Sequence, residues 1–313
     1  MRKPEIAVFG ANPSWQKTLS FEHLLPGEVN RARSADAYAS GKGVNFCRAA
    51  TCHGLCRTRL FQFAGGGNGR RHEAGLRAEK IPFRSIRTAA ETRCCLTCLD
   101  RTAGTMTELI EPSHPVTPEE AARMLAALDE ALIRCSGVAI TGSLPDGTDP
   151  GLYCEVARRS VRRGVPLLVD AVSGILPALD VAKAFLLKVN RSELLRLTGE
   201  QEILPALHKG LQRWPEAILA VTAGPDAAFL ATEGVLYRYE LPAIEVISPL
   251  GAGDTCSAVF LSEILCGTPP AEAFGTALAA ANANCLTPKA GEFAPAERDR
   301  LRNQITIRRV ETV

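Results

Sequence analysis

The segment that decides the fold is Ser248-Pro249-Leu250-Gly251-Ala252-Gly253-Asp254-Thr255, followed by the apolar stretch from Cys256 to Leu265. This pattern predicts a buried helix that begins at a glycine-rich turn. Free backbone N–H groups and the positive end of the helix dipole make such a terminus an anion site, and glycines let a phosphate approach the backbone. We therefore expect an anion hole formed by Gly251, Ala252 and Gly253.

Asp254 follows this hole directly and is the acid best placed to take a proton from an attacking hydroxyl. A simpler interpretation is that Asp254 caps the helix and that the glycines only make a tight turn. For an isolated Gly-x-Gly-Asp segment the cap would be favoured, so the choice depends on the rest of the chain.

A second glycine loop, Ser40-Gly41-Lys42-Gly43-Val44-Asn45, runs into a helical stretch from Phe46 to His53 that ends at Gly54. A loop with a cation and an amide suits a phosphorylated or polyhydroxy ligand. It is not a Walker A loop, because Ala37 stands where the first glycine is required and Gly43 follows the lysine.

Short apolar runs alternate with helix-length amphipathic stretches, which predicts an α/β fold with a mostly parallel sheet. The clearest runs are Ile6 to Phe9, Val138 to Thr141, Leu167 to Asp170, Phe185 to Val189 and Ile218 to Thr222. Thr117 to Arg134 is expected to be a helix, with Thr117 as its N-cap. Two stretches, 18–38 and 83–110, break the alternation and predict strands of a small lid outside the main sheet.

Composition narrows the class of protein. The chain has 313 residues, of which 46% are hydrophobic, and its 36 basic residues nearly balance its 34 acidic ones. These values predict one globular domain over residues 1–313, with no affinity for nucleic acid or a membrane surface. No apolar run reaches about 18 residues and none near the N-terminus suits a signal sequence, so we expect a cytoplasmic protein.

The 11 cysteines are expected to be reduced and buried, because the chain shows no export signal. The cluster of Cys94, Cys95 and Cys98 lacks a second ligand pair at matching spacing, which argues against a structural zinc site.

The order of five motifs resembles that of PfkB-type, ribokinase-like carbohydrate kinases. These motifs are Asn12-Pro13, Gly41-Lys42-Gly43-x-Asn45, Gly142-Ser143-Leu144-Pro145, Asn190-x-x-Glu193 and Gly251-Ala252-Gly253-Asp254. Pro26 to Arg31 and Glu91 to Arg93 are most similar to the 1-phosphofructokinase and tagatose-6-phosphate kinase branch. The resemblance implies a three-layer α/β/α fold with a small β lid, whose strands we place at about 16–38 and 83–111.

The resemblance also implies the ligands, which are ATP, Mg²⁺ and a sugar phosphate held under the lid. On the acceptor side it points to Asn12, Gly41, Lys42, Asn45, Arg93 and Ser143. Cations suit a phosphate that the acceptor already carries, which makes Lys42 and Arg93 its expected partners. Lys42 as a solvated lysine, or Arg93 as a lid residue paired with Glu91 or Glu108, is the plainer alternative.

On the nucleotide side the resemblance implies contacts from Lys188, Asn190, Glu193, Thr222, Gly224 and Asn282. Glu193 would hold Mg²⁺ through water, since a single carboxylate with water suits this ion. Without the family context, Asn190 to Glu193 would be interpreted as a helix capping box.

Gln16 stands where the family carries a sugar-binding aspartate. A glutamine offers one carbonyl and adds a donor, whereas an aspartate accepts with a full charge. Loss of a charged hydrogen bond costs about 1.5 to 3 kcal/mol of binding free energy. Gln16 is therefore expected either to weaken the binding of the usual sugar or to select another sugar.

The sequence therefore predicts a kinase that transfers the γ-phosphoryl group of ATP to a hydroxyl of a phosphorylated ketohexose, of the fructose 1-phosphate, fructose 6-phosphate or tagatose 6-phosphate type. Two alternatives stay open: a kinase of an unphosphorylated sugar or nucleoside, and a non-catalytic regulatory protein that binds a sugar phosphate. A homodimer through the lid is a further expectation.

Overall fold

The computed structural model describes residues 3–225 and 227–310. Within them, the main sheet has ten strands in the order β14-β13-β12-β11-β10-β9-β8-β1-β4-β5. The bounds of these strands are β1 (Glu5–Phe9), β4 (Arg57–Gly65), β5 (Phe83–Thr88), β8 (Gly137–Thr141), β9 (Leu167–Asp170), β10 (Leu186–Asn190), β11 (Ile218–Thr222), β12 (Ala227–Thr232), β13 (Val235–Glu240) and β14 (Thr306–Val310).

Seven neighbouring strands, from β5 to β11, are parallel, and β12 to β14 join them antiparallel. The five apolar runs predicted to be strands are the centre of this sheet, in the order β11-β10-β9-β8-β1. The prediction of a mostly parallel sheet is thus confirmed.

Helices cover both faces of the sheet. Their bounds are α1 (Lys42–His53), α2 (Gly66–Ala78), α3 (Pro118–Leu132), α4 (Gly151–Arg163), α5 (Leu176–Ala182), α6 (Arg191–Thr198), α7 (Ile203–Arg213), α8 (Ala252–Leu265), α9 (Pro270–Cys285) and α10 (Pro295–Arg302). Helix α3 begins as predicted, because Thr117 and Glu120 form a reciprocal capping box. Within the described residues, none of these helices has the length and apolar character needed to cross a membrane.

Alternate residues of each central strand belong to two separate hydrophobic cores. In β1, Ala7 and Phe9 pack with α3 and α4, whereas Ile6 and Val8 pack with α1, α8 and α9. Successive side chains of a strand point to opposite faces, so a strand buried on both sides is apolar throughout. This division is the physical basis of the three layers.

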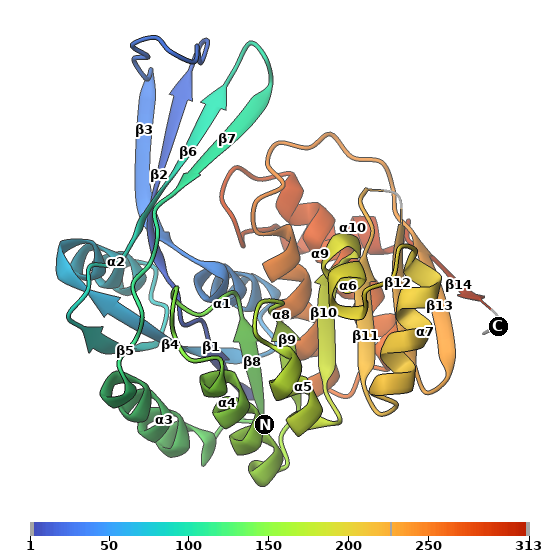
Figure 1. The fold of residues 1–313 in the computed structure, drawn as a ribbon. Helices are drawn as coiled ribbons and strands as arrows, with labels where there is room; N and C mark the ends of the chain where they lie inside the picture. Colours follow the sequence, from blue (N-terminus) through green and yellow to red (C-terminus); the bar gives the residue numbers. More distant parts are fainter. Residues whose placement is uncertain (1–2, 226, 311–313) are drawn as a thin grey trace.

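A second sheet of four strands, in the order β3-β2-β6-β7, rises from one side of the main body (Figure 1). Its strands are β2 (Ser14–Phe21), β3 (Ser34–Ser40), β6 (Cys94–Asp100) and β7 (Thr105–Ile110). We call this sheet the lid. The expectation that the whole stretch 83–111 supplies lid strands is wrong for β5, which lies within it but pairs with β4 and buries Ile86 in the main core.

Helix α1 contacts the end of β1 backbone to backbone. A Cβ atom added at Gly43 would lie 2.9 Å from the Cα of Gly10 and 2.7 Å from Leu60 Cδ1. Neither distance leaves room for a methyl group, so only glycine lets the N-terminus of α1 come this close to the sheet.

We predict that Gly43→Ala lowers the free energy of unfolding by about 1 to 3 kcal/mol, because the added methyl group forces α1 away from β1. Urea denaturation measures this change. Gly67→Ala in α2 is the matched control, since its Cβ would meet its nearest atoms at 3.6 and 3.7 Å. Equal stability of the two variants would contradict the close contact.

Candidate active site

The carboxyl ends of β1, β8, β9, β10 and β11 lie along one edge of the main sheet, because these strands are parallel neighbours, and ligands bind at such an edge in open α/β sheets. A cavity of about 130 Å³ lies at this edge. Its lining consists of Gly10, Asn12, Pro13, Gly41, Lys42, Gly43, Val44, Gln62, Arg93, Thr141, Gly142 and Ser143. The structure thus brings together most of the residues that the sequence assigns to the acceptor.

Helix α8 begins at Gly251, which adopts a left-handed conformation with φ of 78°. A Cβ there would lie 2.7 Å from both Ala290 Cβ and Gly291 N. The left-handed backbone and this close contact therefore each require glycine. No side chain of the described residues caps the first turn of α8. The backbone N–H of Ala252 donates to the Pro249 carbonyl over a long 3.4 Å, whereas those of Gly251 and Gly253 and the helix dipole are available to an anion.

Asp254 does not cap α8; it lies in the first turn and is buried. Its Oδ2 accepts a hydrogen bond of 2.8 Å from Asn45 Nδ2 on α1. Burial raises the pKa of Asp254 from 3.8 to about 6, Lys42 opposes this change, and the nearby Asp170 carboxylate adds to it. A carboxylate with this pKa is suited to accept a proton near neutral pH.

A group of charges surrounds the buried Asp170, at the end of β9. Lys42 Nζ donates to Asp170 Oδ1 over 2.9 Å, Ser257 donates to Oδ2 over 2.7 Å, and Lys188 Nζ lies 3.6 Å from Oδ2. Burial raises the pKa of the Asp170 carboxyl, but the two lysines outweigh it and hold the pKa below its usual value. The ionised Asp170 thus lies between Lys42, on the proposed acceptor side, and Lys188, on the proposed nucleotide side.

Lys42 keeps 43% of its side chain exposed, but its ammonium group is paired with Asp170 over 2.9 Å. Burial lowers the pKa of its ammonium group, but Asp170 and Asp254 outweigh this effect and raise it above its ordinary value. Lys42 therefore stays charged at neutral pH, beside the cavity that it lines.

Asn12, Ser143 and Arg93 lie together on the acceptor side. Asn12 Nδ2 donates to the Ser143 hydroxyl over 3.4 Å, and Arg93 Nη2 donates to the Asn12 carbonyl over 3.3 Å. Arg93 does not pair with Glu91, which accepts from the backbone N–H of Asn68 instead. Two residues that line this cavity, Arg93 and Thr141, each have a buried side-chain atom, Nε and Oγ1, without a hydrogen-bond partner in the part of the chain that the structure describes. Such atoms favour a polar ligand.

Gln16 does not line the cavity described above. It is buried in the lid, where its Nε2 donates to Thr97 Oγ1 over 2.9 Å across the β2–β6 pair. Its amide nitrogen is thus engaged within the lid sheet.

Asn190 and Glu193 form a capping box at the start of α6, as the plainer interpretation predicts. Asn190 Oδ1 accepts from the backbone N–H of Glu193, and Glu193 Oε2 accepts from that of Asn190. Glu193 is half-buried, and its charge contributes to the raised pKa of Lys42, so its carboxylate faces the same charge group. A hard oxygen donor in this place fits Mg²⁺ held through water.

The remaining nucleotide-side residues are spread along the same edge. Thr222 ends β11, and Gly224, two residues later, has φ of 87° and open space where a Cβ atom would lie. Lys188 lies beside Gly253, whose Cβ would come within 2.8 Å of its Nζ. Asn282 is half-buried on α9.

Sequence reasoning missed Asn284, which lies two residues after Asn282. Asn284 is fully buried, and its Oδ1 accepts from Thr255 over 3.0 Å and from the backbone N–H of Gly291 over 2.7 Å. It therefore supports the turn on which Asp254 stands. Sequence reasoning also missed Asp170 and Thr141. Each ends a buried strand with a polar side chain, and this position was the signal that could have identified them.

The model of the pfkB family carbohydrate kinases matches residues 4–297. The chain belongs to this family. It is a carbohydrate kinase, a phosphotransferase that acts on a hydroxyl group. It is 30% identical, over 91% of its own length and 85% of the relative's, to an ATP-dependent 6-phosphofructokinase isozyme 2 of Mycobacterium tuberculosis.

Solved structures confirm the ribokinase-like α/β fold of this kinase. Phosphofructokinase-2 from Escherichia coli, in complex with potassium, has a TM-score of 0.86 at 19% identity, with 96% of this chain and 99% of that chain covered. A protein described as a possible 1-phosphofructokinase from Thermotoga maritima has a TM-score of 0.83 at 20% identity, with 98% and 99% covered.

The cysteines of this kinase are free thiols in the described residues, including Cys94, Cys95 and Cys98. Within the same residues, no three His, Cys, Asp or Glu side chains gather as a metal-binding group.

We predict that Asp254→Asn raises the melting temperature at pH 8. Because the pKa of Asp254 is about 6 in the folded protein and 3.8 in its ordinary state, the native state binds more protons than the unfolded state between these values. Stability is therefore lost as the pH rises through this window. The gain is about 3 to 6 °C at pH 8 and vanishes near pH 4. Calorimetry at both pH values measures it, and an equal difference at both would contradict the raised pKa.

Proposed function

We propose that this kinase transfers the γ-phosphoryl group of MgATP to a hydroxyl of a phosphorylated ketohexose, of the fructose 1-phosphate, fructose 6-phosphate or tagatose 6-phosphate type. The observation that carries this proposal is Asp254, a buried carboxylate with a pKa of about 6 at the uncapped N-terminus of α8. Two cationic side chains, Lys42 and Arg93, line the adjoining cavity.

In this mechanism Asp254 takes the proton of the acceptor hydroxyl as the hydroxyl attacks the phosphoryl group. The backbone N–H groups of Gly251 and Gly253 stabilise the charge that develops on the transferring group, and that of Ala252 joins them by exchanging its 3.4 Å contact with the Pro249 carbonyl. Lys42 adds a fixed positive charge beside Asp254, and positioning and electrostatics supply most of the rate.

The acceptor phosphate is expected at Arg93, because this residue lines the cavity and its buried Nε has no partner among the described residues. A guanidinium matches the geometry of a phosphate dianion. Asn12, Gly41, Asn45 and Ser143 then surround the sugar, with Gln16 in the lid above as a determinant of which sugar is accepted.

The triphosphate of ATP is expected along Lys188, Asn190 and Thr222, and its adenine is expected near Gly224 and Asn282. When bound, Mg²⁺ neutralises charge on the phosphate oxygens, and Glu193 would hold it through water. The relative from M. tuberculosis is ATP-dependent by name, which supports ATP as the donor.

We also propose that the protein forms a homodimer through the lid. All six residues of β7 are exposed, and they include the apolar side chains Leu109 and Ile110. Light scattering tests this proposal: Leu109→Glu would convert a dimer to a monomer, whereas a monomeric wild-type protein would contradict it.

We predict that Asp254→Ala lowers kcat by at least about a hundredfold, because the base is removed. Binding of nucleotide and sugar phosphate should stay within about threefold of the wild type, since the anion hole and the cations remain. ADP release and calorimetric titration measure the two quantities. Full activity of the variant would remove Asp254 from the mechanism.

A panel of hexose phosphates and free sugars identifies the acceptor. We expect turnover on one of fructose 1-phosphate, fructose 6-phosphate and tagatose 6-phosphate, and none on free hexoses, because Arg93 requires a phosphate. Turnover only on free sugars or nucleosides would favour the second kinase hypothesis. Binding of a sugar phosphate without ADP release would favour a regulatory protein.

Gln16→Asp tests the role of the lid residue. We expect it to change kcat/KM for the preferred sugar by about tenfold to a hundredfold relative to the others, as an added charged hydrogen bond would. Thr97→Val is the matched control, because it removes the partner of Gln16 without adding a charge. An unchanged preference in Gln16→Asp would show that Gln16 does not select the sugar.

A further inference from the structure

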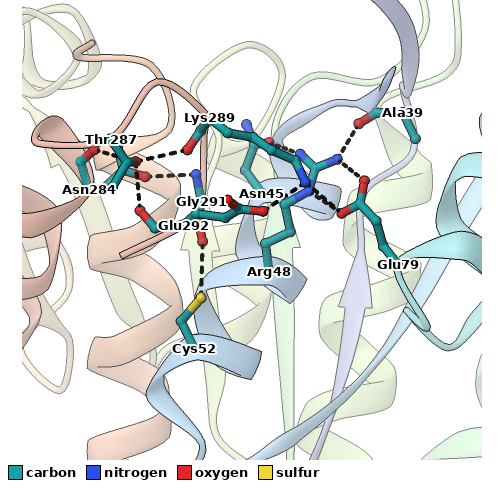
Figure 2. A network of polar contacts seen from close by, with 10 residues as sticks. All are labelled: Ala39, Asn45, Arg48, Cys52, Glu79, Asn284, Thr287, Lys289, Gly291 and Glu292. Carbon is teal, nitrogen blue, oxygen red and sulfur yellow. Dashed lines mark hydrogen bonds and ion pairs between the residues drawn. The ribbon is translucent and has the colours of Figure 1, made fainter. Parts of the chain in front are cut away.

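Arg48 lies one helical turn after Asn45 on α1, and its guanidinium is buried in a network of polar contacts (Figure 2). Nε donates to Glu79 Oε2 over 2.6 Å, and Nη2 donates to Glu79 Oε1 over 2.8 Å. Nη2 also donates to the Ala39 carbonyl over 2.5 Å, while Nη1 donates to Asn45 Oδ1 over 3.1 Å. The mechanism proposed above does not use Arg48.

Three of these contacts hold the guanidinium still. Glu79 accepts from two of its nitrogens, which is the bidentate arrangement that fixes an arginine best. Burial raises the pKa of Glu79, but Arg48 and then Lys289, at 3.5 Å from Glu79 Oε2, outweigh it and lower the pKa. Glu79 is therefore ionised at neutral pH, and the Ala39 carbonyl adds a backbone anchor from lid strand β3.

The Asn45 amide has one partner at each end. Its oxygen accepts from Arg48, and its nitrogen donates to Asp254. A flipped amide would place its NH₂ group against the guanidinium and its oxygen against the carboxylate, so both hydrogen bonds would become repulsive contacts. The fixed guanidinium thus permits only one orientation of the amide.

We infer that Arg48 is a positioning residue that fixes the amide of Asn45 so that Nδ2 donates to Asp254. This inference rests on the proposed function, in which Asp254 is the base. It extends that function by making the base depend on a side chain outside the cavity. Because Ala39 belongs to β3, the same guanidinium links the lid to the base.

The hydrogen bond from Asn45 favours the ionised form of Asp254 and partly offsets the effect of burial on its pKa. The charged groups that face Asp254 are Lys42 on α1, Asp170 at the end of β9 and Lys188 on β10. Substitution of Arg48 leaves all three in place. Loss of one hydrogen bond to a charged group should therefore raise the pKa of Asp254 by about one unit.

The first experiment is a ¹³C NMR titration of the Asp254 carboxyl in the ligand-free full chain, with the resonance assigned by its absence in Asp254→Asn. We expect the midpoint to rise by about one unit in Arg48→Met. Arg159→Met is the matched control, because it removes a largely buried arginine with two acidic partners, Glu155 and Asp129, on the opposite face of the sheet. An unchanged midpoint in Arg48→Met, with the fold intact by circular dichroism, overturns the inference.

A double-mutant cycle distinguishes action through Asn45 from a direct effect of charge. If Arg48 acts through the amide, Arg48→Met adds no shift in an Asn45→Ala background. The same shift in both backgrounds overturns the positioning role. If Arg48→Met does not fold, Glu79→Gln serves instead, because it loosens the guanidinium and should raise the midpoint in the same direction; no change there overturns the inference.

The pH profile of kcat/KM provides the second readout. In Arg48→Met its acid limb should move up by about one unit, so that activity falls about fivefold at pH 6 and stays within about twofold at pH 8.5. The titration needs no substrate, so the two proposals fail separately. A shifted midpoint without turnover on any sugar would refute the proposed function alone, whereas turnover with an unshifted midpoint and limb would refute the role of Arg48 alone.

Discussion

The close contact of α1 with the end of β1 is the constraint on which the site depends. Gly43 packs against Gly10 without a side chain between them, so the helix has one position relative to the sheet. Lys42, Asn45 and Arg48 are spaced three residues apart on this helix and therefore lie along one face. Each reaches a different partner: Asp170, Asp254 and the Glu79 anchor.

A second close contact brings α8 to the same place. Gly291 has φ of 81°, and its Cβ would lie 2.5 Å from the Asn45 carbonyl. The loop after α9 thus contacts α1 on one side and the turn at Gly251 on the other. Asn284 connects the two ends of this arrangement, since it binds Gly291 and Thr255. Two helix N-termini from distant parts of the chain converge on one carboxylate as a result.

The charge group at this convergence includes two buried charges, Asp170 and Lys188, and removing such charges from water is costly. Lys42 and Lys188 are opposed by Asp170 and Asp254, so the four charges nearly cancel. Breaking such a group by removing one member leaves an unpaired buried charge. Asp254 differs from the other members, because its pKa is raised to about 6 and it can therefore take up a proton near neutral pH. This contrast fits the proposal that Asp254 exchanges a proton while Asp170 stays ionised.

The sequence by itself determined the central strands, helix α3 with its cap, the two glycine loops and the family. These features depend on apolar periodicity and turn-forming residues, which involve only residues close together in the chain. It could not assign β5 to the main sheet, since a short mixed strand satisfies either sheet and only pairing with β4 decides. The capping box of Asn190 and Glu193 could be predicted from the sequence. Binding of Mg²⁺ by Glu193 stays a prediction.

Tertiary structure alone decided that Asp170 bridges two lysines, that Gln16 binds Thr97, and that Arg48 orients Asn45. In sequence, Asp170 is the end of a strand and Arg48 is one more helical arginine. Their roles come from partners up to 128 residues away, and no local pattern encodes which side chains a fold brings within hydrogen-bond distance. The pKa of Asp254 follows the same rule, because burial and neighbouring charges set it and neither exists before the chain has folded.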